Sequence, residues 1–475
     1  MKIFIRILIF TGLVVAVAMT LHPGRLRGET SLKKIGLEEA IRTAKRNNPD
    51  FKIALHRQKA DSERVNQVWG MLSPIIESEA SMLRQGADTG FLSMSDGQYD
   101  VKIVQIKFGI NPGLFYNSLQ ISRKAYAVSA EEVKKIKSEI EYDTIQSYFN
   151  LILAEEMISI RKETIRLLQE NLKDVTALFR TGSVPRYELL QAQVQLKSQE
   201  PLLLEAENQH RLAQELLNYQ LGLDGVVYTA DRDIIEKDGY RIAEEDIDAF
   251  VRRVGGLALK SRPEIIQLTM KKEIAGHMKN MNSSYYLWPT FTAGGYYGYN
   301  KALPTATEAY LPTTGGFGYM DLSRIAGDGK WQPNWQVRIA ATYRWSALIP
   351  MDSTRAQERE ARERVLESEA ELDKLKRLIT ISIKSSYSSL LTSYRTIYSL
   401  RENVEKAQEG LRIARESYRA GVIKNSELFA AQVQLTTAQA GYINAINTYY
   451  QSLAKLRKDI GVDDDHAIFG GDGHE

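Results

Sequence analysis

The chain has 475 residues and a formal net charge of +3, with 62 Lys and Arg against 59 Asp and Glu. A charge so near to balance argues against a dedicated nucleic-acid binder, which usually carries a strong basic excess. The absence of cysteine excludes disulfides, thiolate metal sites, a cysteine nucleophile and an N-terminal lipidated cysteine.

The N-terminus has the features of a secretory signal peptide. Basic Lys2 and Arg6 flank an apolar run from Ile7 to Met19. That run is shorter than the ~20 residues that a membrane-spanning helix needs. We therefore predict a signal peptide over residues 1–28, with an uncleaved anchor as the alternative. No later segment is apolar enough for a membrane helix, so a membrane role would have to use strands.

The sequence contains an internal duplication. At a constant offset of 239 residues, Gly182 matches Gly421, and Ala192-Gln-Val-Gln-Leu196 matches Ala431-Gln-Val-Gln-Leu435. The front ends match at a smaller offset, with Pro49 opposite Pro263. The second half therefore carries extra residues, which we place in the loop-like, Gly/Pro/Thr-rich stretch 301–330.

The duplication predicts one order of elements in both halves: a helix (36–70 and 256–285), two strands (75–84 with 99–108, and 288–299 with 335–345), and a long helical hairpin. The predicted domains are a signal peptide (1–28), a first repeat (29–224), an outward-packed linker or equatorial segment (225–255), a second repeat (256–462) and a flexible tail (463–475).

Each repeat contains one exceptionally long helix. Residues 114–180 lack Pro and Gly and are rich in helix formers. At 1.5 Å per residue this segment would measure roughly 100 Å. The matching stretch, 351–420, contains only Gly410 as an interruption. Such lengths indicate a coiled coil or a tube wall. A polar-lined tube and a solvated antiparallel hairpin both fit the charged and Gln-rich remaining faces.

A short glycine-containing break ends each long helix. Glycine directly after a helix commonly adopts a left-handed cap, and proline is tolerated where the next helix starts. A purely structural turn is one reading. The other is a pair of exposed docking tips, formed by Arg180, Thr181, Gly182, Ser183, Val184 and Pro185, and by Arg419, Ala420, Gly421, Val422 and Ile423.

Residues 335–345 form the clearest strand. Apolar side chains occupy one alternating face, and the arginines occupy only the other. A transmembrane strand needs ~9–11 alternating residues with aromatic girdles. An amphipathic strand of a soluble sandwich is the alternative. In the first repeat, Lys102, Gln105 and Lys107 do not alternate onto one face, which predicts a β-bulge or a change of register. The predicted girdle consists of Trp288, Trp335, Tyr343 and Trp345.

Four strands cannot close a barrel, and lipid does not tolerate open strand edges. The strands must therefore be pooled among several chains. Two copies would supply eight strands and three would supply twelve, and the sequence does not choose between them.

The chain resembles the TolC-type outer-membrane efflux protein family over nearly its whole mature length. The resemblance is carried by Leu37-Glu-Glu-Ala-Ile41 with Asn47-Asn-Pro49, by Leu257-Ala-Leu-Lys-Ser-Arg-Pro-Glu264, and by the two tips, each followed by Glu-Leu and Ala-Gln-Val-Gln-Leu. It implies a homotrimer in the cell outer membrane, with a shared transmembrane β-barrel in the lipid bilayer and an α-helical barrel in the periplasm.

The resemblance further implies a passive exit channel of a tripartite efflux or type I secretion system. The partners would be a periplasmic adaptor (membrane fusion) protein and an inner-membrane transporter, and the tips would meet the adaptor and close the tunnel. Unlike many members, this chain lacks an N-terminal cysteine. Acidic rings near the periplasmic mouth select cations in some members. Here Glu416 and Asp174 lie near the tips, where we expect a solvated helix face in preference to such a ring.

No enzyme motif emerges from the residues. The six histidines form no recurring ligand pair, and neither a phosphate loop nor a nucleophile elbow occurs. We predict no catalytic residue, no metal, no cofactor and no nucleic-acid partner. His466 and His474, in the acidic tail, are expected in a disordered terminus rather than a metal site. A periplasmic coiled-coil adaptor or scaffold remains the alternative function.

Overall fold

The structure is a computed structural model that describes residues 32–83, 97–223, 227–231, 245–303, 308–313, 316–321, 329–345, 349–462 and 468–469. The predicted signal peptide lies outside these residues, as do most of the first-repeat loop and of the tail. The chain divides into two compact units. The hairpin unit comprises Met1–Asn48, Asp143–Gly239 and Leu400–Asn447, and the sheet unit comprises the remaining three segments, Pro49–Tyr142, Tyr240–Ser399 and Thr448–Glu475.

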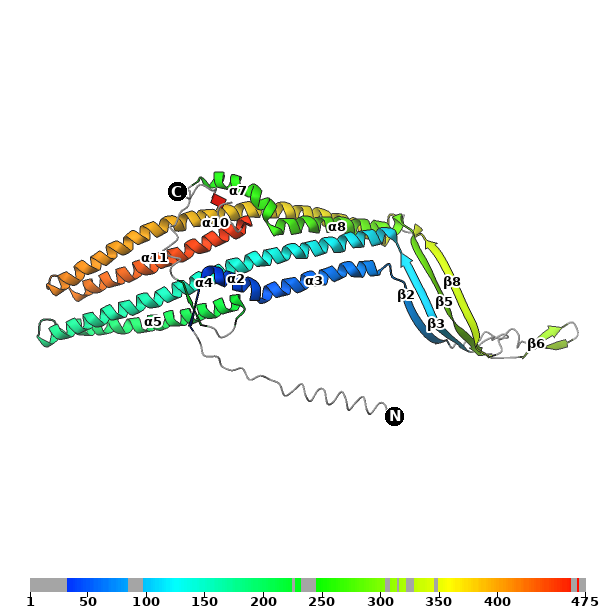
Figure 1. Ribbon diagram of the computed structural model, residues 1–475, viewed down its shortest axis with the longest axis horizontal. Coiled ribbons are helices and arrows are strands. Elements are labelled where there is room, and N and C mark those ends of the chain that lie inside the picture. Colours follow the sequence, from blue (N-terminus) through cyan, green and yellow to red (C-terminus); the bar gives the residue numbers. More distant parts are fainter. Residues whose placement is uncertain are drawn as a thin grey trace, which may run out of the picture. The chain divides into compact units, whose positions relative to one another are not determined.

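The described strands and helices follow one another in alternating groups along the chain (Figure 1). The helices are α2 (Leu37–Asn47), α3 (Pro49–Gly70), α4 (Pro112–Arg180), α5 (Arg186–Leu221), α7 (Ile247–Ser261), α8 (Pro263–Leu287), α10 (Ser353–Arg419) and α11 (Asn425–Ile460). The strands are β1 (Leu32–Ile35), β2 (Ile75–Leu83), β3 (Gly97–Ile110), β4 (Val227–Ala230), β5 (Thr290–Leu303), β6 (Glu308–Thr313), β7 (Gly316–Asp321) and β8 (Gln332–Thr342).

The first helix of each repeat is broken into two, where the sequence predicted one. The breaks fall at Asn48–Pro49 and at Arg262–Pro263. Proline has no N–H to donate and disfavours helical geometry in the residue before it. Because proline is well tolerated as the first residue of a helix, each one ends one helix and begins the next.

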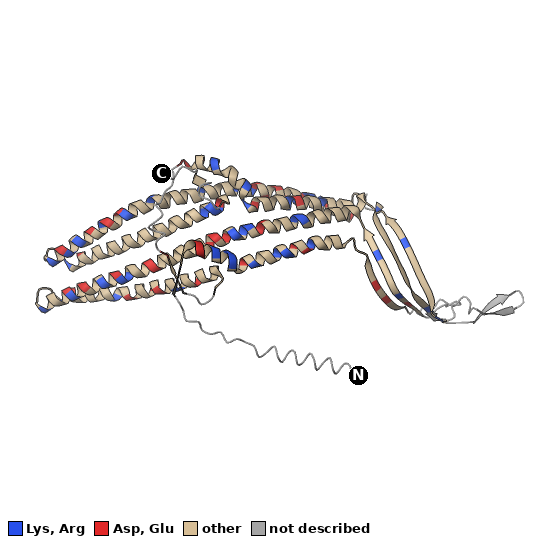
Figure 2. Cartoon of the chain, in the orientation of Figure 1, with Lys and Arg blue, Asp and Glu red and all other residues tan. Residues whose placement is uncertain are grey.

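The two long helices are confirmed. α4 has 69 residues and α10 has 67, and Gly410 lies within α10 without interrupting it. Acidic and basic residues recur along both helices (Figure 2). Many of them pair three or four residues apart, an arrangement that gives weak support to an exposed helix face.

The hairpin unit contains a strand pair that the sequence did not predict. β1 and β4 pair in parallel, and the fully buried Tyr148 of α4 joins them. Its hydroxyl donates to the Ile35 carbonyl over 3.1 Å and accepts from the Asp231 N–H over 2.9 Å. Burial raises the pKa of Tyr148 to about 12. This tyrosine therefore fixes the start of the linker between the repeats.

The sheet unit contains an antiparallel sheet in the order β2-β3-β5-β8. The predicted bulge is confirmed at Ile103, where the register of β3 shifts against both of its neighbours. Gly298 faces the bulge in β5, and an added Cβ there would lie 2.1 Å from the Val101 carbonyl oxygen. In the stretch expected to be a loop, β6 and β7 instead pair as an antiparallel hairpin.

Helix α7 packs on α10 in the same unit. Phe250 stacks on Tyr387 with ring centroids 3.8 Å apart. The Tyr387 hydroxyl donates to the Glu245 carbonyl and accepts from its N–H, each over 3.2 Å. In the predicted flexible tail, Ile468 is fully buried, and its carbonyl accepts from Arg253 over 2.8 Å. An apolar side chain in a polar terminus therefore holds this part of the tail in place.

Candidate functional site

The first tip joins α4 to α5. Gly182 has φ of +74°. Its N–H bonds to the Phe179 carbonyl over 3.0 Å, and the Ser183 N–H bonds to the Leu178 carbonyl over 2.9 Å. This pair of bonds is the Schellman arrangement, which satisfies the last carbonyls of a helix. Pro185 occupies the N-cap of α5, as the sequence indicated.

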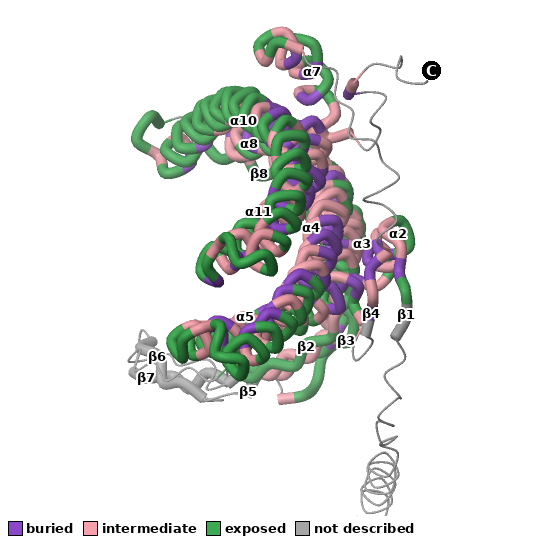
Figure 3. Tube along the Cα trace, turned by 90° about the vertical axis from the view of Figure 1, so that its left-hand side faces the viewer, coloured by how far each residue is buried: buried purple, intermediate pink, exposed green. Residues whose placement is uncertain are grey.

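The second tip repeats this geometry between α10 and α11. Gly421 also has φ of +74°. Its N–H bonds to the Tyr418 carbonyl and the Val422 N–H to the Ser417 carbonyl, both over 2.9 Å. Val422 is 76% exposed, whereas Ile423 packs against a small core. Figure 3 shows exposed residues at both hairpin ends. The structure thus places nine of the eleven tip residues in two short turns, while Arg180 and Arg419 are the last residues of α4 and α10. Val184 and Ile423 are half-buried, and the other nine are exposed.

Buried polar contacts join α4 to α11 behind the tips. Asn171 donates to the side-chain oxygen of Asn425 over 2.7 Å, and both residues are buried. The hydroxyls of Thr164 and Thr436 lie 2.9 Å apart. Because a buried amide without its partner costs about 1–3 kcal/mol, these contacts specify one register between the hairpins. Sequence analysis missed both pairs, since residues 254 positions apart leave no local pattern.

An apolar cluster supports the second tip. It is formed by Ala407 and Leu411 of α10 with Leu428 and Leu435 of α11, and Leu167 of α4 packs against it. Tyr418 also packs there. Burial, followed by the nearby carboxylates of Glu188 and Asp174, raises the pKa of Tyr418. Tyr418 therefore remains a neutral phenol at physiological pH.

A matching ion-pair motif lies on both long helices near the tips. Arg166 bonds to Glu163 over 2.6 Å and pairs with Glu170. In α10, Arg412 bonds to Glu409 over 2.6 Å and to Glu416 over 2.7 Å. Hydrogen bonds from the two guanidinium groups lower the pKa of Glu163 and of Glu409.

This motif could have been found in the sequence, because Glu-x-x-Arg-x-x-x-Glu occurs at 163–170 and again at 409–416. Glu416 and Asp174 are exposed, as expected for a solvated helix face.

The four-stranded sheet has one apolar and one polar face. Val337 and Ile339 of β8 are 71% and 84% exposed, and they pair with Gly295 and Ala293 of β5. Because of the bulge at Ile103, Lys102 and Lys107 of β3 both lie on the opposite, polar face. There Lys102 bonds to Glu79 over 3.0 Å and Lys107 bonds to Glu77.

The predicted girdle residues lie at this sheet. Trp335 is in β8 and is 70% exposed. Trp288 caps the C-terminus of α8, just before β5. β8 ends at Thr342, so Tyr343 and Trp345 lie beyond the strand. Their ring centroids are 4.7 Å apart.

Comparison with known families settles the relationship. The model of the outer membrane efflux protein family matches residues 40–223 and 309–462. The chain belongs to the outer membrane efflux protein family. No match was found among the curated proteins.

The fold is shared with solved members of the same kind. The Campylobacter jejuni CmeC outer membrane channel aligns over 90% of this chain and 85% of its own, at 18% identity and a TM-score of 0.69. VceC of Vibrio cholerae aligns over 90% and 96%, at 15% identity and a TM-score of 0.67. The open MtrE channel of Neisseria gonorrhoeae aligns over 90% of this chain and 89% of its own, at 16% identity and a TM-score of 0.66.

Membership confirms the predicted fold class, location and general function. The family consists of passive outer-membrane exit channels for efflux rather than enzymes. Its channels are homotrimers that work with periplasmic adaptors and inner-membrane transporters, so the predicted partners are confirmed as well. None of the described helices is long and apolar enough to cross a membrane. Within the described residues, no group of three or more His, Asp or Glu side chains could hold a metal ion.

Proposed function

We propose that this chain is the passive exit channel of a tripartite efflux assembly, and that it performs no catalysis itself. The two tips would dock the periplasmic adaptor and close the tunnel, and Trp288, Trp335, Tyr343 and Trp345 would form the membrane girdle. The two repeats, with the 225–255 segment between them, would each supply half of the strands and one hairpin. The observation that carries the proposal is the sheet with one exposed apolar face.

The open edges of this sheet support assembly from several copies. β2 and β8 are its outer strands, and each leaves one row of backbone groups without a partner in the sheet. In lipid every such group must be paired. All neighbouring strands are antiparallel, so β2 and β8 run in opposite directions. β8 of one copy can therefore pair with β2 of the next around a closed ring.

An exposed apolar stripe on α5 supports the same head-to-tail assembly. Near the first tip its large side chains recur at helical spacing and remain 48–70% exposed in the single chain: Tyr187, Leu190 and Val194. Such a stripe usually marks a protein interface. Because α5 forms one edge of the hairpin unit, a neighbouring copy is the natural cover for this stripe.

The absence of native cysteine makes the sheet closure directly testable. Val337→Cys in β8 would be combined in turn with Ile76→Cys, Ser78→Cys or Ala80→Cys in β2, and outer membranes would be oxidised. We expect one of the three pairs to give covalently linked dimers and trimers on non-reducing gels, while the single Val337→Cys control gives none. A chain that stays monomeric with every pair, in a soluble periplasmic fraction, would favour the scaffold function.

The proposed tip role can be tested separately from assembly. Val422→Asp places a charge on a side chain that is 76% exposed, so folding and trimer yield should not change. We expect the producing strain to become as susceptible to exported compounds as a strain without the channel. Unchanged resistance with a normal trimer would remove this tip from the docking surface.

A further inference from the structure

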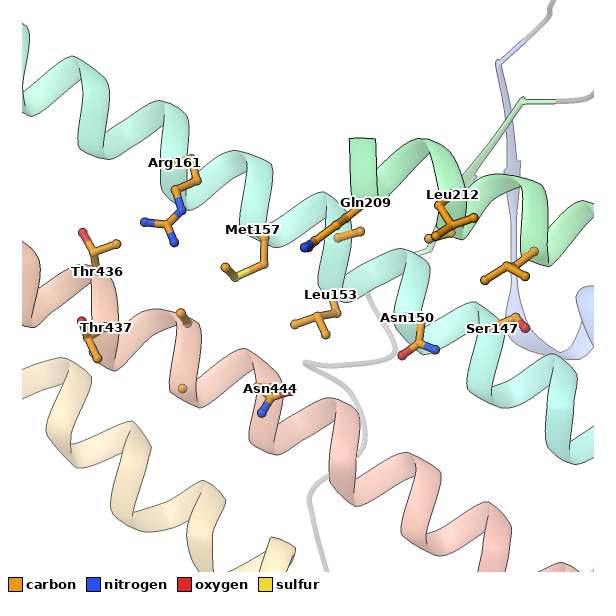
Figure 4. Close-up of a pocket in the computed structure, with 15 residues that line it drawn as sticks. Ser147, Asn150, Leu153, Met157, Arg161, Gln209, Leu212, Thr436, Thr437 and Asn444 are labelled. Carbon is orange, nitrogen blue, oxygen red and sulfur yellow. The ribbon is translucent and has the colours of Figure 1, made fainter. Parts of the chain in front are cut away.

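A groove of about 710 Å³ lies in the hairpin unit between three helices (Figure 4). Its volume falls within the range of small-molecule sites. It is lined by Ser147, Asn150, Leu153, Ala154, Met157 and Arg161 of α4, by Gln209, Leu212, Ala213 and Leu216 of α5, and by Thr436, Thr437, Ala440, Gly441 and Asn444 of α11.

The groove and the β1–β4 strand pair lie on opposite faces of α4. Groove residues Asn150, Met157 and Arg161 recur at intervals of seven and four. Tyr148 and Glu155, which bond to the strand pair, share another face. At 100° per residue these two sets point to opposite sides of the helix. If the strand pair packs on the outside of the channel, as proposed for the linker segment, the groove faces the tunnel, and this placement rests on the proposed function.

The groove combines an apolar floor with a single charge. Leu153 and Met157 of α4 and Leu212 of α5 supply apolar surface, and Asn150 and Asn444 supply amide groups (Figure 4). Arg161 is the one charged side chain in the lining, which contains no carboxylate.

Arg161 also differs from its neighbour on the same helix. Arg166 is held between Glu163 and Glu170, whereas no carboxylate among the residues that the structure describes forms an ion pair with Arg161. A guanidinium group cannot lose its charge in a protein. In a half-buried groove it therefore favours an anion from outside the chain.

We propose that this groove binds amphipathic organic anions, with the carboxylate or sulfonate on Arg161 and the apolar body against Met157, Leu153 and Leu212. Charge complementarity selects the anion, and the apolar floor selects its hydrocarbon part. A channel with this site would make selective contact with anionic amphiphiles during their passage. Inorganic anions would gain only the charge interaction and would bind far more weakly.

The test is a binding titration with 8-anilinonaphthalene-1-sulfonate on the full-length channel in zwitterionic lipid nanodiscs, with the signal of empty nanodiscs subtracted. We expect saturable binding. Arg161→Gln should weaken it about tenfold or more, since a hydrogen bond to a charged group is lost. Met157→Gln keeps length and helix propensity and should weaken it severalfold. The matched control, Arg166→Gln, should leave binding unchanged.

Three results would refute the proposed anion binding. They are no saturable binding, equal weakening by Arg161→Gln and Arg166→Gln, or displacement of the probe by a naphthyl trimethylammonium cation as readily as by a naphthalene sulfonate. Conductance across planar bilayers, measured on the same preparations, tests the channel separately. Conductance without selective binding refutes the groove alone, whereas selective binding without conductance refutes the channel and leaves the groove supported.

Discussion

The two helical hairpins share a pentapeptide but bury different parts of it. In α5, Ala192 and Gln195 of Ala-Gln-Val-Gln-Leu are buried. In α11 the buried positions are Gln432 and Leu435, which correspond to residues one place further along the repeat. A shift of one residue rotates a helix face by about 100°. The same pentapeptide therefore buries a different helix face in each hairpin, because the neighbouring helices differ.

The difference lies in the number of neighbours. α11 packs against α10 through the cluster around Leu428 and contacts α4 through Asn425. α5 lies at an edge of the hairpin unit and leaves a stripe that includes Tyr187 and Val194 exposed. The duplicated hairpins thus have the same turn geometry but bury different helix faces. The buried face depends on which helices lie alongside, whereas the turn depends only on its own residues.

The largest expected effect contrasts matched leucines. Leu428→Ala in the cluster should cost about 2–5 kcal/mol, as expected for a buried leucine. Leu189→Ala, its repeat counterpart, is only half-buried and should cost clearly less. Thermal melting of the detergent-solubilised trimer would measure both. Equal losses would mean that the two hairpins pack alike after all.

A second contrast concerns the asparagine pair. Asn425→Ala leaves the buried Asn171 amide without its partner and should destabilise by about 1–3 kcal/mol. The repeat counterpart, Arg186→Ala, changes an exposed side chain and should alter stability by no more than about 0.5 kcal/mol. The melting temperature of each variant trimer would measure both effects. An unchanged melting temperature for Asn425→Ala would show that the contact does not fix the register.

Replacing the glycine of either turn should reduce stability equally, unlike the substitutions in the packed helices. Gly182→Ala and Gly421→Ala each force a side chain into φ of +74°, at a cost of about 1–2 kcal/mol. Neither added Cβ meets another atom within 4 Å, so backbone strain is the whole effect. Melting temperatures that fall by different amounts would argue against a shared turn geometry.

The smallest effect concerns the linker. Tyr148 and Tyr387 occupy equivalent repeat positions. Their hydroxyls bond to the backbone of Asp231 and Glu245, which flank linker residues 232–244 in the sequence. Tyr148→Phe and Tyr387→Phe should each cost about 1 kcal/mol. Limited proteolysis between the two anchors should accelerate in both variants. A cut rate equal to that of the unaltered chain would contradict an anchoring role.

The raised pKa of Tyr148 adds a pH dependence. Its folded-state pKa is about 12, against 10.0 for a free tyrosine. The unfolded chain therefore loses this proton first. The stabilisation is complete below pH 10 and is lost as the pH rises from 10 to about 12. The stability difference between the unaltered chain and Tyr148→Phe should shrink over this window, whereas a constant difference would show that the tyrosine does not ionise late.

The sequence determined by itself the features that depend on local chemistry and short-range periodicity. The two long helices, both glycine caps, four strands and the bulge near Lys102 were all readable, because propensity, positive φ and alternation are written in neighbouring residues. The family could be recognised for the same reason, since the duplicated tips and their order survive as sequence. The helix breaks at Pro49 and Pro263 belong to the same class, because proline acts on the residue directly before it.

Only the tertiary structure decided what lies next to what. The β1–β4 pair, the Asn171–Asn425 contact and the groove at Arg161 join residues far apart in the chain. No local pattern encodes such pairs, because their energy comes from burial and desolvation after the helices have packed. For the same reason one pentapeptide can bury Gln195 in one hairpin and Leu435 in the other.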